Sequence, residues 1–215
     1  MHRRLFLTAM AAALPTSVWA AQKDPVKLAK AFPYLDVYLK MPSAQRSRFS
    51  LVYYMLRDGK PAGDLHAWIV DGAARTPLAL DHDGRVLHPP TLAQISGDAM
   101  LQFDVPADAV LKPRLELHAA APVAAQIDAA DLQLSINQAG EAVKKIAGPM
   151  SFAAPKITAA QFPGGVSGKA ALPDGRAFAL APGKFGPLYD PAKEPGAKTI
   201  ILAKAPSRIL LTPSA

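Results

Sequence analysis

The sequence predicts an α+β protein, built from antiparallel β-sheets or a sandwich with one long helix packed on a sheet face. Residues 49–57 alternate between two largely apolar faces, which is typical of a central strand covered on both sides. Short apolar runs follow with Asp-Gly turns between them, and such turns favour antiparallel strands. One long stretch with helical periodicity begins at Asp128, and its apolar stripe needs a sheet face to cover it.

The elements before the long helix are short. Helices are expected at residues 26–31 and from Pro33 to the residue before Pro42, and Tyr34 in the second is expected to pack on the domain edge. The Asp58-Gly59 turn predicts a hairpin that joins the first two strands. The strands expected in this half are residues 49–57, 65–70, 78–80, 85–87, 100–105 and 114–118.

The stretch 128–155 holds the long helix. Asp128 can cap its first turn, and Gly148 followed by Pro149 favours a stop. Between them, apolar residues recur at steps of four and three and therefore share one helical face. They are Leu132, Ile136, Ala139, Val143 and Ile146. We expect the whole stripe to be buried against a sheet.

An alternative exists at the front of this helix. Leu132, Leu134 and Ile136 also alternate, so a strand followed by a shorter helix from Asn137 fits the same residues. We favour one continuous helix because no turn residue separates the two halves.

The last part of the chain again predicts short strands and turns. A Pro-Asp-Gly turn at 173–175 favours a hairpin, and the Pro- and Gly-rich stretch 182–198 is typical of a long surface loop. The expected strands are residues 156–162, 170–172, 177–180, 199–203 and 208–211.

Residues 1–20 have the three parts of a secretory signal peptide. A basic start at Arg3 and Arg4 precedes an apolar run at residues 5–14, and small residues surround the expected cleavage site after Ala20. The apolar run is shorter than the roughly 20 residues that span a membrane. The paired arginines before Leu-Phe-Leu also resemble the twin-arginine export motif, with an ordinary secretory signal as the alternative. We therefore expect a periplasmic mature protein.

Composition limits what this mature protein can be. Removing residues 1–20 leaves 22 basic against 17 acidic residues, a net charge of +5 that is scattered along the chain. This predicts a solvated basic surface and no nucleic-acid binding. The absence of cysteine excludes disulfides and thiolate chemistry. Residues 21–215 suit one soluble α+β domain that does not span the membrane, with 163–215 as a candidate small C-terminal β extension.

The end of the long helix carries a resemblance. Residues 141–148 read Glu-Ala-Val-Lys-Lys-Ile-Ala-Gly, and residues 149–157 continue Pro-Met-Ser-Phe-Ala-Ala-Pro-Lys-Ile. With the short N-terminal helix, the two-faced strand and the Asp-Gly hairpins, this order resembles a family of small exported bacterial proteins whose domain has no assigned function. The resemblance covers residues 32–162. It implies an exported α+β domain and carries over no catalytic residue.

Patterns for catalysis, metal or nucleotide binding fail on spacing. His82 lies between two aspartates in a turn, but a metal loop needs more oxygen ligands at fixed spacing. Around Ser167, the stretch 164–169 lacks the second glycine of a serine elbow, and Pro163 replaces the leading glycine of a phosphate loop. We therefore expect no catalytic, cofactor-binding or metal-binding residue.

Three residues are candidate ligand contacts. His66 and Trp68 share one face of an expected strand, and Tyr189 lies in the expected loop 182–198. Exposed aromatic rings stack on sugars, although core or edge packing of the tryptophan is the simpler interpretation.

The function that follows is a non-catalytic binding or accessory protein of the bacterial cell envelope, whose partner is an envelope protein or a glycan. One alternative is a small periplasmic hydrolase in which carboxylates converge with His66 or His82. Another is a basic module that binds acidic glycans or lipid headgroups.

Overall fold

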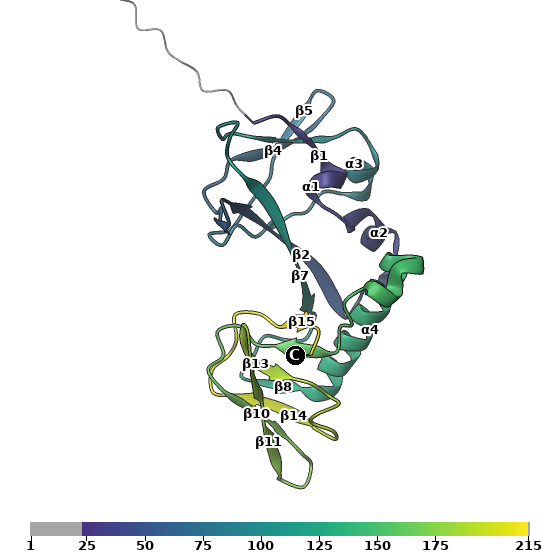
Figure 1. Ribbon diagram of the computed structural model, residues 1–215, viewed down its shortest axis with the longest axis vertical. Helices are drawn as coiled ribbons and strands as arrows, with labels where there is room; N and C mark the ends of the chain where they lie inside the picture. Colours follow the sequence, from purple (N-terminus) through teal and green to yellow (C-terminus); the bar gives the residue numbers. More distant parts are fainter. Residues whose placement is uncertain (1–22, 215) are drawn as a thin grey trace, which may run out of the picture.

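The computed structural model describes residues 23–214, apart from the side chains of residues 149–151. The predicted signal peptide, residues 1–20, lies outside the described residues. The chain forms two lobes, which the long strand pair β2 (Phe49–Arg57) and β7 (Leu111–Ala119) connects across a narrower waist (Figure 1). The strands pair antiparallel throughout, so the α+β class predicted from the sequence is confirmed.

The first lobe contains a four-stranded sheet in the order β1-β6-β4-β5. Its strands are β1 (Val26–Lys27), β6 (Met100–Phe103), β4 (Ala67–Asp71) and β5 (Ala74–Pro77). Two short helices, α1 (Leu28–Ala31) and α3 (Leu92–Ser96), lie beside it. They bury Leu28 and Ile95 in the same core as Leu101 of β6. One face of the sheet is thus covered, and the other carries Trp68 and Val70.

The second lobe contains another four-stranded sheet, in the order β11-β10-β14-β8. Its strands are β11 (Ala177–Ala179), β10 (Gly168–Ala171), β14 (Thr199–Leu202) and β8 (Gln126–Asp128). The hairpin β10–β11 turns at Pro173-Asp174-Gly175, as the sequence predicts. Helix α4 (Ala129–Ala147) follows β8 directly.

A seven-stranded sheet links the lobes in the order β12-β13-β9-β15-β7-β2-β3. Its remaining strands are β12 (Ala181–Gly183), β13 (Gly186–Tyr189), β9 (Ala159–Gln161), β15 (Leu210–Thr212) and β3 (Lys60–Pro61). β2 and β7 pair over their full length, from Phe49 opposite Ala119 to Arg57 opposite Leu111. Strands from the end of the chain therefore complete a sheet that its first half begins.

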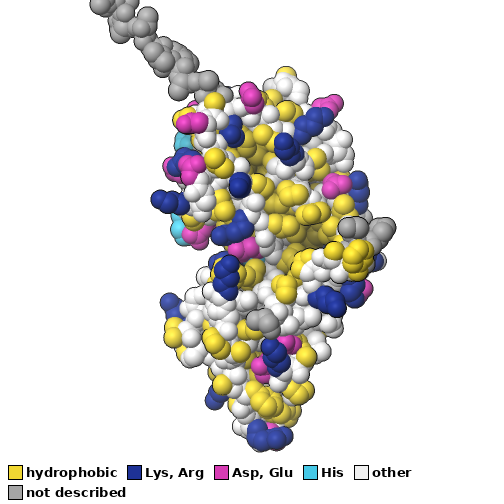
Figure 2. Space-filling view, viewed as in Figure 1, with side chains coloured by type: hydrophobic (Ala, Val, Ile, Leu, Met, Phe, Trp, Pro, Cys, Tyr) yellow, Lys and Arg dark blue, Asp and Glu magenta, His cyan; other side chains and the backbone are white. Residues whose placement is uncertain are grey.

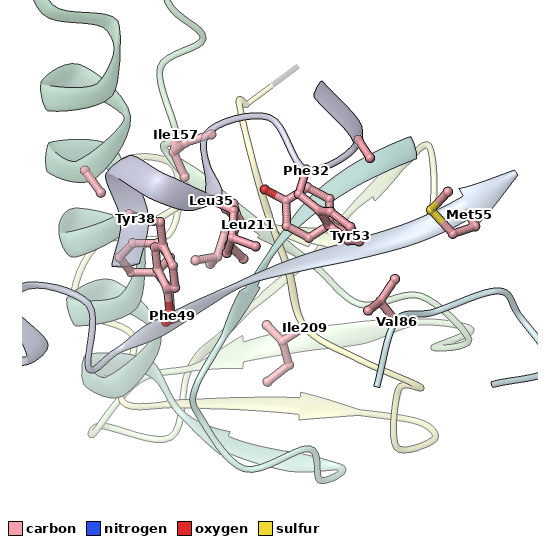
Figure 3. Close-up of a cluster of buried hydrophobic side chains, with 14 of the residues drawn as sticks. Phe32, Leu35, Tyr38, Phe49, Tyr53, Met55, Val86, Ile157, Ile209 and Leu211 are labelled. Carbon is pink, nitrogen blue, oxygen red and sulfur yellow. Dashed lines mark hydrogen bonds between the residues drawn. The ribbon is translucent and has the colours of Figure 1, made fainter. Parts of the chain in front are cut away.

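Both faces of β2 are largely buried, because its alternating residues contact different layers. The odd-numbered residues face the helices, and Figure 3 shows Phe49 beside Tyr38 of α2 (Leu35–Lys40) and Tyr53 beside Phe32. These ring pairs are edge-on, with centroids 5.6 and 5.1 Å apart. Buried residues of both lobes belong to one contiguous hydrophobic cluster.

Helix α4 begins and ends where the sequence predicts. The Asp128 carboxylate accepts hydrogen bonds from the backbone N–H groups of Ala130 (2.7 Å) and Asp131 (3.2 Å), satisfying two of the first-turn donors. Gly148 follows with φ of 54°, a conformation that favours glycine. The chain then continues as the 3₁₀ helix η2 (Gly148–Ala153). The strand alternative at Leu132–Ile136 is therefore wrong.

The apolar stripe of α4 is only partly covered, which corrects the expectation that all of it is buried. Leu132, Ile136 and Ala139 are buried, whereas Val143 and Ile146 are half-buried. Close packing holds the helix in its middle, where a Cβ on Gly140 would lie 3.3 Å from the Ile157 carbonyl oxygen. Beyond this point, Val143 and Ile146 keep part of their surface exposed.

Polar contacts fix the other flank of α4 to the segment that contains η1 (Ser43–Gln45). Gln138 accepts from the Arg48 backbone N–H at 2.6 Å and donates to the Ala44 carbonyl at 2.8 Å. Lys145 donates to Gln45 at 2.7 Å. These polar contacts hold α4 in place on this flank, while the last residues of its apolar stripe, Val143 and Ile146, stay partly exposed.

Several local features differ from the sequence-based expectations. The Asp58-Gly59 turn joins β2 to the short β3, while β4 pairs in the other sheet. The stretch 182–198 is partly strand, since β13 and most of β12 lie in it. Helix α3 is unpredicted, although Thr91 and Gln94 form a capping box that the sequence displays.

Candidate functional site

An apolar groove of about 790 Å³ lies at the waist, between the end of α4 and the central sheet. Figure 2 shows hydrophobic side chains gathered in this hollow, with charged side chains bordering it. We call it the waist groove. Its apolar lining includes Leu51, Leu115 and Leu117 on β2 and β7, Val143, Ile146 and Ala147 on α4, and Ile157 and Leu211. The uncovered end of the α4 stripe is therefore one wall of this groove.

Two exposed aromatic residues stand at the rim of the waist groove. Tyr34, in the first half of the chain, is 54% exposed, and Phe185, in the turn between β12 and β13, is 45% exposed. Tyr34 has φ of 68°, a left-handed conformation that is unfavourable for a bulky side chain. The preceding carbonyl, of Pro33, accepts a hydrogen bond from the buried Tyr53 hydroxyl, which helps to hold this geometry. Strain of this kind clusters at functional sites.

The floor of the waist groove includes an open strand edge. β15 pairs with β7 only at Leu210 opposite His118 and Leu211 opposite Leu117. Among the described residues, β7 has no strand partner on that side between residues 111 and 116. The Ala119 N–H donates toward β15, to the Ile209 carbonyl at 3.0 Å, and alternate residues of a strand point the same way. The Leu115 backbone N–H and C=O therefore face the groove.

Charged residues gather where the waist groove passes over this edge. Glu116 accepts from Arg208 Nε at 2.9 Å and Nη2 at 3.3 Å, and Arg114 Nε lies 3.3 Å from its Oε1. His118 Nε2 lies 2.9 Å from Glu116 Oε2. We call these four residues the ionic cluster. Glu116 and His118 are buried, whereas the Arg114 side chain is 42% exposed.

The cluster is held together by the charge of Glu116. Burial works to raise the pKa of this carboxyl group, but hydrogen bonds from His118 and Arg208 and the charges of Arg208 and Arg114 outweigh it and lower the pKa below its ordinary 4.5. Glu116 is thus ionised at neutral pH. Burial, followed by the Glu116 charge, raises the pKa of the neighbouring Tyr54, against the opposing effect of the nearby arginines.

The chemistry of this cluster is electrostatic. In the part of the chain that the structure describes, the hydrogen-bond partner of the His118 ring is Glu116, and no side-chain hydroxyl is hydrogen-bonded to it. Nor do the described residues contain three or more His, Asp or Glu side chains placed to hold one metal ion. Arg114 and Glu116 alternate with Leu115 and Leu117 along β7, so the charged and the apolar side chains project to opposite faces of the strand. Both pairs border the waist groove, where the edge of β7 is open.

The sequence-predicted contacts His66 and Trp68 lie elsewhere, on the outer face of the first lobe. Their ring centroids are 6.4 Å apart, and the Arg75 guanidinium stacks 4.1 Å from the Trp68 ring centroid. His66 is exposed and Trp68 half-buried. The structure thus brings these two together, on a surface separate from the waist groove.

The third sequence-predicted contact, Tyr189, is a core residue of β13 with 2% exposure. Burial, with the nearby carboxylates of Glu194, Asp190 and Asp128, raises its pKa to about 12. Its hydroxyl is therefore neutral at physiological pH, and the side chain is not presented to solvent.

The sequence does not single out the groove residues Arg114, Tyr34 and Phe185. Arg114 belongs to a strand whose inward leucines the sequence shows, but its position at an open edge depends on where β15 ends. Phe185 is one of few aromatic residues in the last part of the chain, which is a weak signal.

Comparisons with protein-family models, with curated proteins and with solved structures find no match to this chain. The resemblance to an exported family over residues 32–162 therefore stays a prediction. Within the described residues, no helix has the length and apolar character that crossing a membrane requires.

Proposed function

We propose that this chain is an exported, non-catalytic binding protein of the bacterial cell envelope, and that the waist groove is its ligand site. The observation that carries the proposal is the uncovered half of the α4 stripe. Val143 and Ile146 continue a buried apolar row, yet they face a groove whose size suits a small organic ligand. Apolar residues grouped in a concave surface are typical of a binding site.

The envelope location is supported by the N-terminal pattern of residues 1–20. N-terminal sequencing of the protein isolated from its producing cells tests it, and a mature chain that begins at Ala21 is the expected result. A cytoplasmic protein that retains Met1 would contradict export.

Binding in the waist groove is tested with Nile red, a neutral apolar dye whose fluorescence rises when it leaves water. We expect the mature protein to bind the dye and Ile146→Glu, which places a charge on the groove wall, to lose this binding. Leu134→Glu is the matched control, because Leu134 is an exposed leucine on another side of the same helix. Far-UV circular dichroism checks that both variants are folded.

The control also locates the dye. Leu134 borders a second, smaller groove on the other flank of α4, beside Met41 and Arg48. Loss of binding in Leu134→Glu alone, or equal binding by all three proteins, would refute the waist groove as the ligand site.

A further inference from the structure

We propose that the waist groove takes an anionic amphiphile, a single alkyl chain with a carboxylate or phosphate headgroup, and that Arg114 holds the headgroup at the open edge of β7. This inference rests on the proposed binding function and specifies its ligand. It joins two features that lie on opposite faces of β7, the apolar lining under α4 and the ionic cluster, and that both border the groove at the open edge of this strand.

The first step concerns charge. Tyr54 lies in the field of three arginines, Arg85, Arg114 and Arg208, and of one carboxylate, Glu116. Three positive charges and one negative give the face of the sheet that carries Tyr54 a surplus of two positive charges, before His118 is considered. Such a surplus favours an anionic partner in a site that is partly shielded from water.

The second step concerns donors. Arg208 donates two hydrogen bonds to Glu116, whereas Arg114 contacts it as an ion pair, with Nε 3.3 Å from Oε1. Its planar group lies 4.6 Å from the Tyr54 ring centroid, which fixes its orientation. Among the described residues, the two terminal amino groups of Arg114 have no acceptor within hydrogen-bonding distance. A guanidinium with free amino groups binds carboxylate or phosphate in bidentate geometry.

The third step concerns the edge of β7, where the Leu115 N–H adds one more donor beside Arg114. This edge is poorly suited to an added peptide strand. Pro113 lacks a donor at the next position that faces the groove, and Pro213 stands where β15 would continue past Leu211. An extended peptide depends on a row of backbone hydrogen bonds, so the edge favours a compact headgroup over a strand.

The fourth step concerns the apolar part of the ligand. Leu115 and Leu117 project to the face of β7 that also carries Leu51, under Val143 and Ile146 of α4. An alkyl chain placed here leaves water along its length. Each methylene that is fully buried strengthens binding about fourfold.

The experiment measures the binding of dodecanoate, dodecyl phosphate and dodecanol to the mature protein by isothermal titration calorimetry, below the concentrations at which micelles form. We expect the anionic ligands to bind at least about tenfold more tightly than the alcohol, because they gain a charge-assisted hydrogen bond. The tighter of the two anions identifies the headgroup. Decanoate is expected to bind about sixteenfold more weakly than dodecanoate, because it has two methylenes fewer.

Arg114→Gln should reduce dodecanoate binding to the level of dodecanol and leave dodecanol unchanged. Lys112→Gln is the matched control, since Lys112 lies on the same face of β7, is exposed and carries the same charge. It should bind both ligands like the unaltered protein. Thermal melting confirms that the Arg114 variant is folded.

Each other outcome has a separate meaning. If dodecanoate and dodecanol bind equally, or if Lys112→Gln weakens dodecanoate as much as Arg114→Gln does, the headgroup inference is wrong while the apolar site stands. If no alkyl ligand binds, or if Ile146→Glu does not affect binding, the proposed function itself fails. The last outcome concerns an apolar peptide with blocked ends. If it displaces dodecanoate equally well from the unaltered protein and from Arg114→Gln, the groove takes a peptide strand along β7, and the proposal is overturned.

Discussion

The two halves of helix α4 carry the same apolar stripe and have different surroundings. In the first half, Leu132 and Ile136 are excluded from water by the sheets beneath them. In the second half, Val143 and Ile146 continue the row but border the waist groove. The periodicity of a helix thus shows which residues share a face, and the rest of the fold decides what covers that face. We propose that the end of the stripe, which is only partly covered, is a binding surface.

The largest expected effect tests this comparison directly. Leu132→Ala should cost about 2–5 kcal/mol of unfolding free energy, because it removes a fully buried side chain and leaves a cavity. Ile146→Ala should cost about 1 kcal/mol, because its side chain is half-exposed already and less burial is lost. Urea unfolding measures both. Equal losses would mean that the second half of the stripe is covered as fully as the first.

The second prediction concerns the sheet beneath the second half of α4. Charged hydrogen bonds hold this sheet together, in addition to apolar contacts. Glu116→Gln should cost on the order of 2 kcal/mol, because the carboxylate accepts charge-assisted hydrogen bonds from Arg208. The loss should depend on pH. The pKa of Glu116 is lower in the folded protein, so its contribution is complete above the unfolded pKa and disappears as the pH falls through the folded value.

Unfolding of both proteins from pH 7 down to pH 2 gives the measurement. The difference between the unaltered protein and Glu116→Gln should stay constant down to about pH 5 and shrink below Glu116's ordinary pKa of 4.5. A difference that persists unchanged at pH 2 would show that the carboxylate charge is not the stabilising feature.

Some of these features follow from the sequence. The bounds of β2 and the Asp128 cap are local, because alternation and a capping side chain depend on residues a few positions apart. The groove and the ionic cluster are not local. Glu116 and Arg208 are 92 residues apart in sequence, and the open edge of β7 exists because β15 pairs at only two residues before Pro213. Only the pairing of distant strands, which sequence periodicity does not specify, creates them.

The same limit explains the candidate contacts. Alternation places His66 and Trp68 on one strand face, and their rings are neighbours. The prolines and glycines around Tyr189 predict a loop, yet β13 pairs with β9 through this residue, opposite Ala160, and buries it. The composition of residues 182–198 indicates turns but does not indicate the strand β13 that lies within them.

The third prediction concerns the first turn of α4, which Asp128 caps. Asp128→Ala should cost about 1 kcal/mol, because two first-turn N–H groups lose their acceptor. Asp128→Asn keeps a side-chain oxygen in place and should unfold close to the unaltered protein. If the asparagine variant loses as much as the alanine variant, the negative charge and not the hydrogen bonds stabilises this end.

The last prediction has the smallest expected effect on stability, and it concerns the solvent-exposed side of the second half of α4. Lys144 donates to Glu141 at 2.8 Å, and both side chains are well exposed. This hydrogen bond, followed by the Lys144 charge, lowers the pKa of Glu141. Lys144→Ala should therefore return the pKa of Glu141 toward its ordinary value, while the urea midpoint barely changes because water screens exposed pairs. Titration of the Glu141 carboxyl by NMR and urea unfolding of the same variant provide the two readouts. If the pKa of Glu141 does not change in Lys144→Ala, the two side chains do not pair in solution. If the variant loses as much stability as Leu132→Ala, this side of the helix is packed as tightly as the first half of the stripe.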